Sequence, residues 1–205
     1  HPALATASPQ TRVTIARTLL DYMRRELAIK VDYLDSSYQE RIQQLSSQRL
    51  IDPWAIDEDE RMEYASVLIP RSSAGEDGRG NYTYVSARGG FGIYLRRPGT
   101  LGEYNAVAYG KLGLDETGTL IRQLLEGLRV AGLVEVVREA QSDDDVPGYQ
   151  LVASAMRWFA GAGEHAFHDP IRVPNESQEG GRPNKFFVEF YQSVAGSLVG
   201  LEAHE

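Results

Sequence analysis

The sequence contains no cysteine among its 205 residues. Disulfides, thiol nucleophiles and cysteine metal ligands are therefore excluded, and this composition is typical of a reducing compartment. The chain also lacks an apolar run long enough to span a bilayer, and the residues after His1 show neither the charged nor the apolar region of a signal peptide. We expect a cytoplasmic protein with no membrane partner.

Positive charge is scarce as well. The chain has 21 lysine and arginine residues against 29 aspartate and glutamate residues, which gives a net charge of -8. Affinity for duplex DNA depends mainly on the neutralisation of phosphates by lysine and arginine, so this balance argues against a free-standing DNA-binding protein. We expect that other parts of a larger protein help to hold any nucleic acid that the chain contacts.

Motifs for catalysis and for cofactors are also missing. There is no Gly-x-x-x-x-Gly-Lys-[Ser/Thr] phosphate loop, which excludes ATP binding by that route, and no Ser/His/Asp order or carboxylate pair in an apolar setting. The acidic run from Asp57 to Glu60 is typical of a solvated helix start. His165 and His168 lack further metal ligands at a usable spacing, and Asp169 before a proline favours a turn. We expect no enzymatic activity, cofactor or metal in this chain.

The segment from 114 to 130 has a clear helical pattern. Its leucines recur at helical spacing and predict one buried side, formed by Leu120, Leu124, Leu125 and Leu128. Asp115 or Thr117 can cap the start of this helix, and Gly132 stands where the helix is expected to end.

A hairpin is predicted directly after this helix. Leu133 to Val137 is rich in β-branched residues, a turn with acidic residues, proline and glycine occupies 142–148, and Tyr149 to Val152 resumes the strand pattern. A helix followed at once by a hairpin is typical of a recognition helix and its wing. We therefore interpret residues 91–160 as a winged helix-turn-helix domain, with its middle helix over 101–112.

The solvent side of the predicted recognition helix carries Arg122, Gln123, Glu126 and Arg129. Arginine and glutamine side chains reach phosphates and base edges when a helix lies in a major groove. The candidate nucleic-acid-binding residues are Arg96, Arg97, Arg122, Gln123, Arg129 and Arg138. The same spacing fits an alternative without nucleic acid, in which the charged residues of the helix form a charge ladder on a solvated face.

An N-terminal α-hairpin over 1–70 is predicted from the spacing of apolar residues. The first helix, capped by Ser8, is expected to turn inward Val13, Ala16, Leu20, Met23 and Leu27. The second helix, from about Asp35, is expected to turn inward Tyr38, Ile42 and Leu45 and to end before Pro53. A strand or extended segment at 65–70 follows this hairpin.

The remaining segments complete an α+β fold that is mostly helical. Residues 71–80 form a loop within a linker over 71–90, and a short helix is expected over 91–97. Residues 161–205 combine a loop-rich stretch with a helix from about Asn184. In that helix the spacing favours core packing over base stacking for the aromatic residues Phe186, Phe187, Phe190 and Tyr191.

Two motifs close the chain, Phe186-Phe187-Val188-Glu189-Phe190-Tyr191 and Gly200-Leu201-Glu202-Ala203-His204-Glu205. Shorter motifs precede them: Leu27-Ala28-Ile29, Gly132-Leu133-Val134, Gly148-Tyr149-Gln150-Leu151 and Asp169-Pro170-Ile171-Arg172. Together they resemble the stretch ahead of the second RecA-like lobe in large bacterial DEAD/DEAH-box helicases of superfamily 2, such as the helicases of the DISARM phage-defence systems. The resemblance implies a winged-helix insertion between two motor lobes, which would bind ATP and magnesium themselves. The acidic residues Asp143 to Asp145 depart from a phosphate-binding wing.

The leading hypothesis is an accessory, nucleic-acid-engaging winged-helix domain of an ATP-dependent DNA helicase, in anti-phage defence or DNA repair. Its partners would be single-stranded or forked DNA, the adjoining RecA-like lobes and a partner subunit. The first alternative is a free transcription regulator that dimerises through the C-terminal helix. The second is a protein-docking module that uses the acidic wing and the apolar helices, and an enzyme with its own active site comes last.

Overall fold

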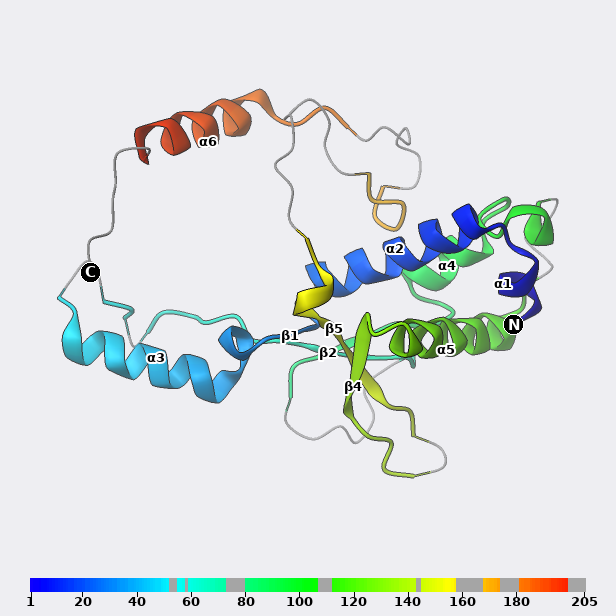
Figure 1. The fold of residues 1–205 in the computed structure, drawn as a ribbon, viewed down its shortest axis with the longest axis horizontal. Helices are drawn as coiled ribbons and strands as arrows, with labels where there is room; N and C mark the ends of the chain where they lie inside the picture. Colours follow the sequence, from blue (N-terminus) through cyan, green and yellow to red (C-terminus); the bar gives the residue numbers. More distant parts are fainter. Residues whose placement is uncertain are drawn as a thin grey trace. The chain divides into compact units, whose positions relative to one another are not determined.

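The computed structural model describes residues 1–51, 55–57, 59–72, 80–106, 112–142, 145–157, 168–173 and 181–198. The chain consists of two compact units, residues 1–157 and residues 158–205, and each is described by itself. The first unit combines helices and strands (Figure 1), which confirms the mixed α and β content that the sequence predicts. No helix in the described ranges is long and apolar enough to cross a membrane.

The described part of the first unit contains a five-stranded sheet. Its strands are β1 (Ile29–Lys30), β2 (Val67–Ile69), β3 (Tyr82–Tyr84), β4 (Val134–Arg138) and β5 (Gly148–Val152). β5 pairs antiparallel with β4, parallel with β1, and antiparallel with β2 where Tyr149 faces Leu68, while β3 is parallel to β2. Segments 1–70, 71–90 and 91–160 therefore contribute strands to the same sheet, and the predicted linker contains β3.

The core of this unit lies between its helices and the sheet. α4 (Gly90–Arg96) contacts α5 (Leu114–Val130), α5 contacts β4, and α2 (Pro9–Arg25) contacts β5. The largest fully buried side chains are Ile15, Leu19, Met23, Leu68, Ile69, Phe91, Leu95, Leu101, Leu120, Ile121, Leu125 and Val134. The remaining short helical elements of the unit are α1 (Pro2–Thr6) and the 3-10 turns η1 (Asp32–Leu34), η2 (Gly102–Asn105) and η3 (Ala153–Ala155).

Helix α2 begins where the sequence predicts, because the Ser8 side chain accepts a hydrogen bond from the backbone N–H of Thr11 at 3.1 Å. The predicted inward side of α2 is wrong. Of the residues predicted to face inward, Val13, Ala16, Leu20, Met23 and Leu27, only Met23 is buried. Val13 is 59% exposed, and the buried apolar residues recur instead every four positions, at Ile15, Leu19 and Met23. Apolar residues occur on more than one side of this helix, so their spacing alone does not identify the side that faces the core.

Leu27 lies beyond the end of α2 and not inside the helix, which corrects the predicted helical pattern. Its backbone is left-handed, with a φ of 54°. The N–H of Ala28 donates to the carbonyl of Met23 at 2.8 Å, and the N–H of Leu27 donates to that of Arg24 at 3.2 Å, which is the Schellman pattern of a helix end. This turn brings the chain to β5, where the N–H of Leu151 donates to the carbonyl of Ala28 at 2.7 Å.

Helix α3 (Ser36–Arg49) forms as predicted, but it does not make a hairpin with α2. β1 and η1 intervene, and Figure 1 shows α3 extending away from the other helices of the unit. The predicted inward side is also wrong, since Tyr38 and Ile42 are each 39% exposed while Gln39 is buried. The physical reason is a set of glutamine hydrogen bonds, described below.

The predicted helix over 91–97 is observed as α4, whereas the predicted middle helix over 101–112 is wrong at its start. Residues 102–105 form only the turn η2, and residues 107–111 lie outside the described part of the chain. The buried side chain of Asn105 explains the difference. Its amide donates to the carbonyls of Leu95 and Arg97 at 3.0 and 2.8 Å, and its oxygen accepts from the N–H of Leu101 at 2.9 Å. These bonds stabilise a tight turn where the periodicity predicts a helix.

Helix α5 and the hairpin of β4 and β5 agree with the prediction. The predicted buried side is confirmed for Leu120, Leu124, Leu125 and Leu128. The predicted caps are wrong, because Gly113 occupies the cap position and its N–H donates to the carboxylate of Glu116 at 3.0 Å. This bond resembles half of a capping box, in which an acidic side chain in the first turn reaches back to the cap.

Gly132 ends α5 as predicted, in a left-handed conformation with a φ of 72°. The N–H of Leu133 donates to the carbonyl of Leu128 at 3.0 Å, and the N–H of Gly132 donates to that of Arg129 at 3.0 Å. These are the two bonds of a Schellman motif, which requires a residue that tolerates positive φ. Gly132 therefore determines the angle at which the chain enters β4.

We expect Gly132→Ala to lower the free energy of unfolding by about 1 kcal/mol, because an L residue is strained at this φ. A Cβ at position 132 would meet no atom within 4 Å, so steric clash makes no contribution. Gly127→Ala is the matched variant, since it lies inside α5 and its Cβ would also meet nothing. That change should raise stability by about 0.5–1 kcal/mol. Urea denaturation measures the free energy of unfolding of both variants. Equal changes in the two variants would contradict the backbone conformations of Gly132 and Gly127.

In the second unit, helix α6 (Lys185–Leu198) begins next to Asn184, close to the predicted position. The aromatic side chains of α6 contact one another, and the rings of Phe186 and Phe190 are stacked at 6.2 Å. The predicted core packing is wrong, because the exposed fractions are 66% for Phe186, 53% for Phe187, 51% for Phe190 and 66% for Tyr191. Within the described residues of 158–205 no other helix or strand is present to cover this side of α6.

Candidate nucleic-acid interface

The exposed side of α5 brings together three of the six predicted nucleic-acid-binding residues, Arg122, Gln123 and Arg129. The opposite side of the helix is buried, which leaves this side as the one available to a ligand. Arg122 makes a single described hydrogen bond, from Nη2 to Thr119 Oγ1 at 3.2 Å. The side-chain oxygen of Gln123 accepts a hydrogen bond from the amino group of His1.

Arg129 is paired with Glu126 one turn earlier on the helix. Its Nε and Nη2 donate to the two carboxylate oxygens at 2.8 and 2.6 Å. The hydrogen bonds from Arg129 lower the pKa of Glu126, and the hydrogen bonds to Glu126 raise the pKa of Arg129. Part of the charge-ladder alternative is therefore observed, although Arg122 forms no ion pair in the described residues.

Arg138 does not face solvent as a phosphate ligand would. Its Nη2 donates to Asp145 Oδ2 at 2.8 Å and its Nη1 donates to the carbonyl of Val146 at 2.9 Å, with only 13% of the side chain exposed. The position of Arg138 near the turn of the hairpin lets its guanidinium fold back across the hairpin, and contact of this residue with nucleic acid stays a prediction. We infer that Arg138 holds the hairpin together.

Asp145 is the centre of this arrangement, and sequence reasoning misses it. In addition to Arg138, its carboxylate accepts from the N–H of Gln141 at 3.0 Å and from Arg71 Nη1 at 3.1 Å. The hydrogen bond from the Gln141 backbone, followed by that from Arg138, lowers the pKa of Asp145 to about 2. The sequence predicts Asp145 as part of an acidic wing tip, whose other members Asp143 and Asp144 lie outside the described residues.

Arg96 and Arg97 lie at the end of α4, on a different element from Arg122 and Arg129. Arg96 donates to the carbonyl of Ala87 at 3.0 Å and to that of Gly92 at 3.3 Å, so it stabilises the loop before its own helix. The guanidinium of Arg97 lies 5.9 Å from the centre of the Tyr94 ring. The side chain of Arg96 is therefore committed to local structure, which the charge pattern does not reveal.

The predicted turn at Asp169 is confirmed. Its carboxylate accepts hydrogen bonds from the N–H groups of Ile171 at 2.9 Å and Arg172 at 3.1 Å, and its carbonyl accepts from Val173 at 2.9 Å. His165 lies outside the described residues. Among the residues that the structure does describe, no three histidine, aspartate or glutamate side chains are grouped so that they could hold a metal ion.

Comparison of the chain with protein-family models, with curated proteins and with solved structures finds no match. The resemblance to superfamily 2 helicases therefore rests on the short sequence motifs alone and stays a prediction. The candidate interface is defined by the geometry of α5 and of the hairpin.

Proposed function

We propose that this chain is an accessory winged-helix module of an ATP-dependent DNA helicase, which acts in the cytoplasm in anti-phage defence or DNA repair. In this proposal α5 contacts single-stranded or forked DNA beside the motor lobes. ATP and magnesium bind to those lobes, because the chain itself lacks a phosphate loop. The chain alone has no catalytic activity, and a partner subunit would assemble with the longer protein.

The observation that carries the proposal is the order and pairing of α5, β4 and β5. The Schellman turn at Gly132 leads from α5 directly into β4, and β5 returns antiparallel to it. β2 pairs antiparallel with β5 at Leu68, so a strand from the N-terminal half adjoins the hairpin. A helix next to such a hairpin is the arrangement that places a recognition helix in a groove with the wing beside it.

Two guanidinium groups on α5 support contact with phosphates. Arg122 is exposed and has no ion-pair partner among the described residues. Arg129 is held by Glu126 in an ion pair with 45% and 52% of the two side chains exposed. An ion pair this exposed contributes little free energy, so a phosphate can replace the carboxylate of Glu126 at low cost. With a net charge of -8, the chain would bind DNA weakly without the lobes.

The test is a titration of fluorescein-labelled forked DNA with the chain, followed by anisotropy at several salt concentrations. We expect Arg122→Ala/Arg129→Ala to weaken binding by about tenfold at low salt. The slope of log K against log salt should fall by about one for each phosphate that the variant no longer neutralises. The fold should be unchanged, because both side chains are exposed.

Arg12→Ala/Arg88→Ala is the matched control, since it removes the same charge from two exposed residues on other elements. We expect it to retain the salt slope of the unaltered chain. Equal decreases in affinity for both double variants would mean that only net charge matters and would contradict the proposal.

Protein docking is a second candidate function, favoured by the inward bonds of Arg138 and by the acidic charge of the chain. A hairpin whose arginine binds Asp145 and a backbone carbonyl offers little to phosphates. If forked DNA does not bind at any salt concentration, this candidate replaces the first.

A further inference from the structure

The polar side of helix α3 faces the segments of the chain just before and just after the helix. The side-chain nitrogen of Gln39 donates to the carbonyls of Tyr33 and Glu63 at 2.7 and 2.9 Å, and that of Gln43 donates to the carbonyl of Asp57 at 2.6 Å. One turn later, Ser46 Oγ accepts from the N–H of Ile56 at 2.8 Å. The chain after α3 is therefore bonded to this polar side at Ile56, Asp57 and Glu63, which forces the apolar residues of α3 to the outside.

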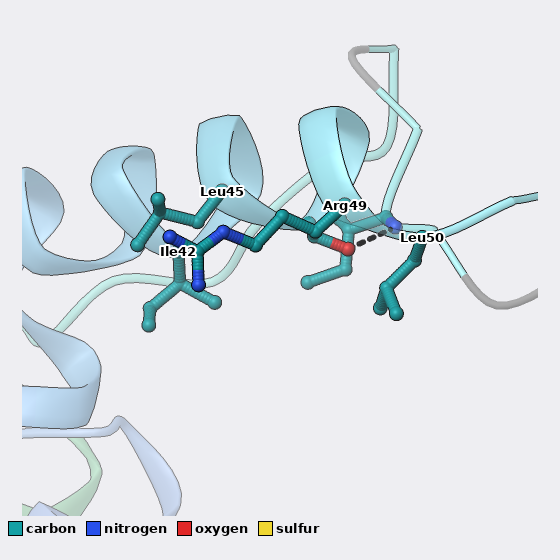
Figure 2. A pocket seen from close by; sticks show the side chains of 6 residues that line it. Ile42, Leu45, Arg49 and Leu50 are labelled. Carbon is teal, nitrogen blue, oxygen red and sulfur yellow. Dashed lines mark hydrogen bonds between the residues drawn. The ribbon is translucent and has the colours of Figure 1, made fainter.

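Helix α3 and the chain that follows it form an apolar groove. Ile42, Leu45, Ser46, Arg49, Leu50 and Ile56 line a volume of about 400 Å³ (Figure 2). Ile42 is 39% exposed and Leu50 is 50% exposed, and Tyr38 continues the row one turn before Ile42. Apolar residues that are normally buried thus lie next to one another on the surface, which is typical of an interaction site.

One basic residue, Arg49, lines the groove, and a second, Arg41, is exposed on the same helix, in a chain whose net charge is -8. Figure 2 shows the side chain of Arg49 extending back along the helix toward Ile42 and Leu45. Arg41 lies one position before Ile42 and is exposed. Within the described residues neither Arg41 nor Arg49 forms an ion pair or a side-chain hydrogen bond, although several arginines elsewhere in this unit do. An acidic ligand would complement both guanidinium groups.

We propose that the groove of α3 binds an amphipathic helix with bulky apolar residues on one side and acidic residues on its flanks. Tyr38, Ile42, Leu45 and Arg49 are spaced by four, three and four positions, which is the spacing of a ridge that packs against a second helix. Arg41 and Arg49 select acidic flanks through charge complementarity. This proposal is independent of DNA binding, because it uses a different helix from α5.

The test uses two synthetic amphipathic peptides with leucines at the same helical positions. One peptide carries glutamates on its flanks, and the other carries lysines there. We expect the full chain to bind the glutamate peptide about tenfold more tightly than the lysine peptide in fluorescence anisotropy. The charge-reversal variant Arg41→Glu/Arg49→Glu should invert this preference. Both positions are exposed, so the variant should fold.

Two further variants make the test specific. Ile42→Asp should abolish most of the binding of both peptides, and its circular dichroism spectrum and thermal midpoint show whether it is folded. Arg12→Glu/Arg88→Glu reverses the same charge on exposed residues of other elements, so we expect it to prefer the glutamate peptide as the unaltered chain does.

Three results would overturn the proposal. Equal affinity for both peptides, or no binding, would exclude an acidic helix. Dimerisation in sedimentation velocity that Ile42→Asp abolishes would identify a second copy of this chain as the occupant. Binding to anionic phospholipid vesicles that disappears in Ile42→Asp would identify a membrane surface instead.

Discussion

Gly92→Ala is expected to destabilise the first unit by about 3 kcal/mol, in the upper part of the range for overpacking substitutions. A Cβ at position 92 would lie 2.3 Å from the carbonyl oxygen of Ser86 and 2.4 Å from that of Ala87. Both atoms belong to the backbone, so the clash cannot be relieved by a change of rotamer. Helix α4 would have to move away from the loop before it, which would disturb the buried side chains Phe91 and Leu95.

The measurement is urea denaturation followed by circular dichroism, with Gly118→Ala as the control. A Cβ at position 118 would make an ordinary contact with Arg122 at 3.6 Å, so this change should leave stability equal or slightly higher. If Gly92→Ala lowers the free energy of unfolding by less than about 1 kcal/mol, α4 can move freely against the loop, which would contradict this prediction.

Replacement of Asp145 by asparagine is expected to lower the thermal midpoint at neutral pH by several degrees. The change removes the negative charge of the carboxylate to which Arg138 and Arg71 donate. The side chains of these two arginines are only 13% and 25% exposed. A partly buried cation without its counterion is strongly unfavourable. Because Arg71 and Arg138 come from distant parts of the chain, the hairpin and the end of β2 should both loosen.

The effect of Asp145→Asn should also depend on pH in a defined direction. The pKa of Asp145 is lowered from 3.8 to about 2 in the folded chain, so its contribution is present above the unfolded pKa and disappears as the pH falls through the folded pKa. The difference in thermal midpoint between the unaltered chain and Asp145→Asn should therefore shrink between about pH 4 and about pH 2, which thermal scans of both proteins at a series of pH values measure. Glu139→Gln is the control, because Glu139 is exposed and near the same hairpin. A difference that stays constant with pH would contradict the ion pairs.

Local signals in the sequence predict the elements that depend on neighbouring residues. The leucines of α5, the glycine at 132 and the cap at Ser8 each act within a few positions of the chain, so the sequence pattern reveals them. The antiparallel pairing of β4 and β5 is also local, because one short connection joins the two strands. The predictions for these elements are correct for this physical reason.

Hydrogen bonds from side chains to backbone groups explain two of the errors. Gln39 and Gln43 determine which side of α3 faces inward through bonds to backbone groups, and no periodicity reports such bonds. Asn105 replaces the start of a predicted helix with a turn for the same reason.

In the candidate site, too, the sequence pattern predicts the features that follow from helical spacing and misses those that depend on side-chain hydrogen bonds. The helical spacing correctly places Arg122, Gln123 and Arg129 on one exposed side of α5. The role of Arg138 depends instead on its bond to Asp145 across the hairpin, which charge alone does not predict.

The most direct test of nucleic-acid contact through α5 is nuclear magnetic resonance of the 22.8 kDa chain labelled with ¹⁵N and titrated with forked DNA at low salt. We predict that the largest changes in amide chemical shift occur at Arg122, Gln123 and Arg129, and that they diminish as salt is added. Changes confined to α3, or no changes at DNA concentrations that saturate the anisotropy signal, would contradict a role for α5 in binding DNA.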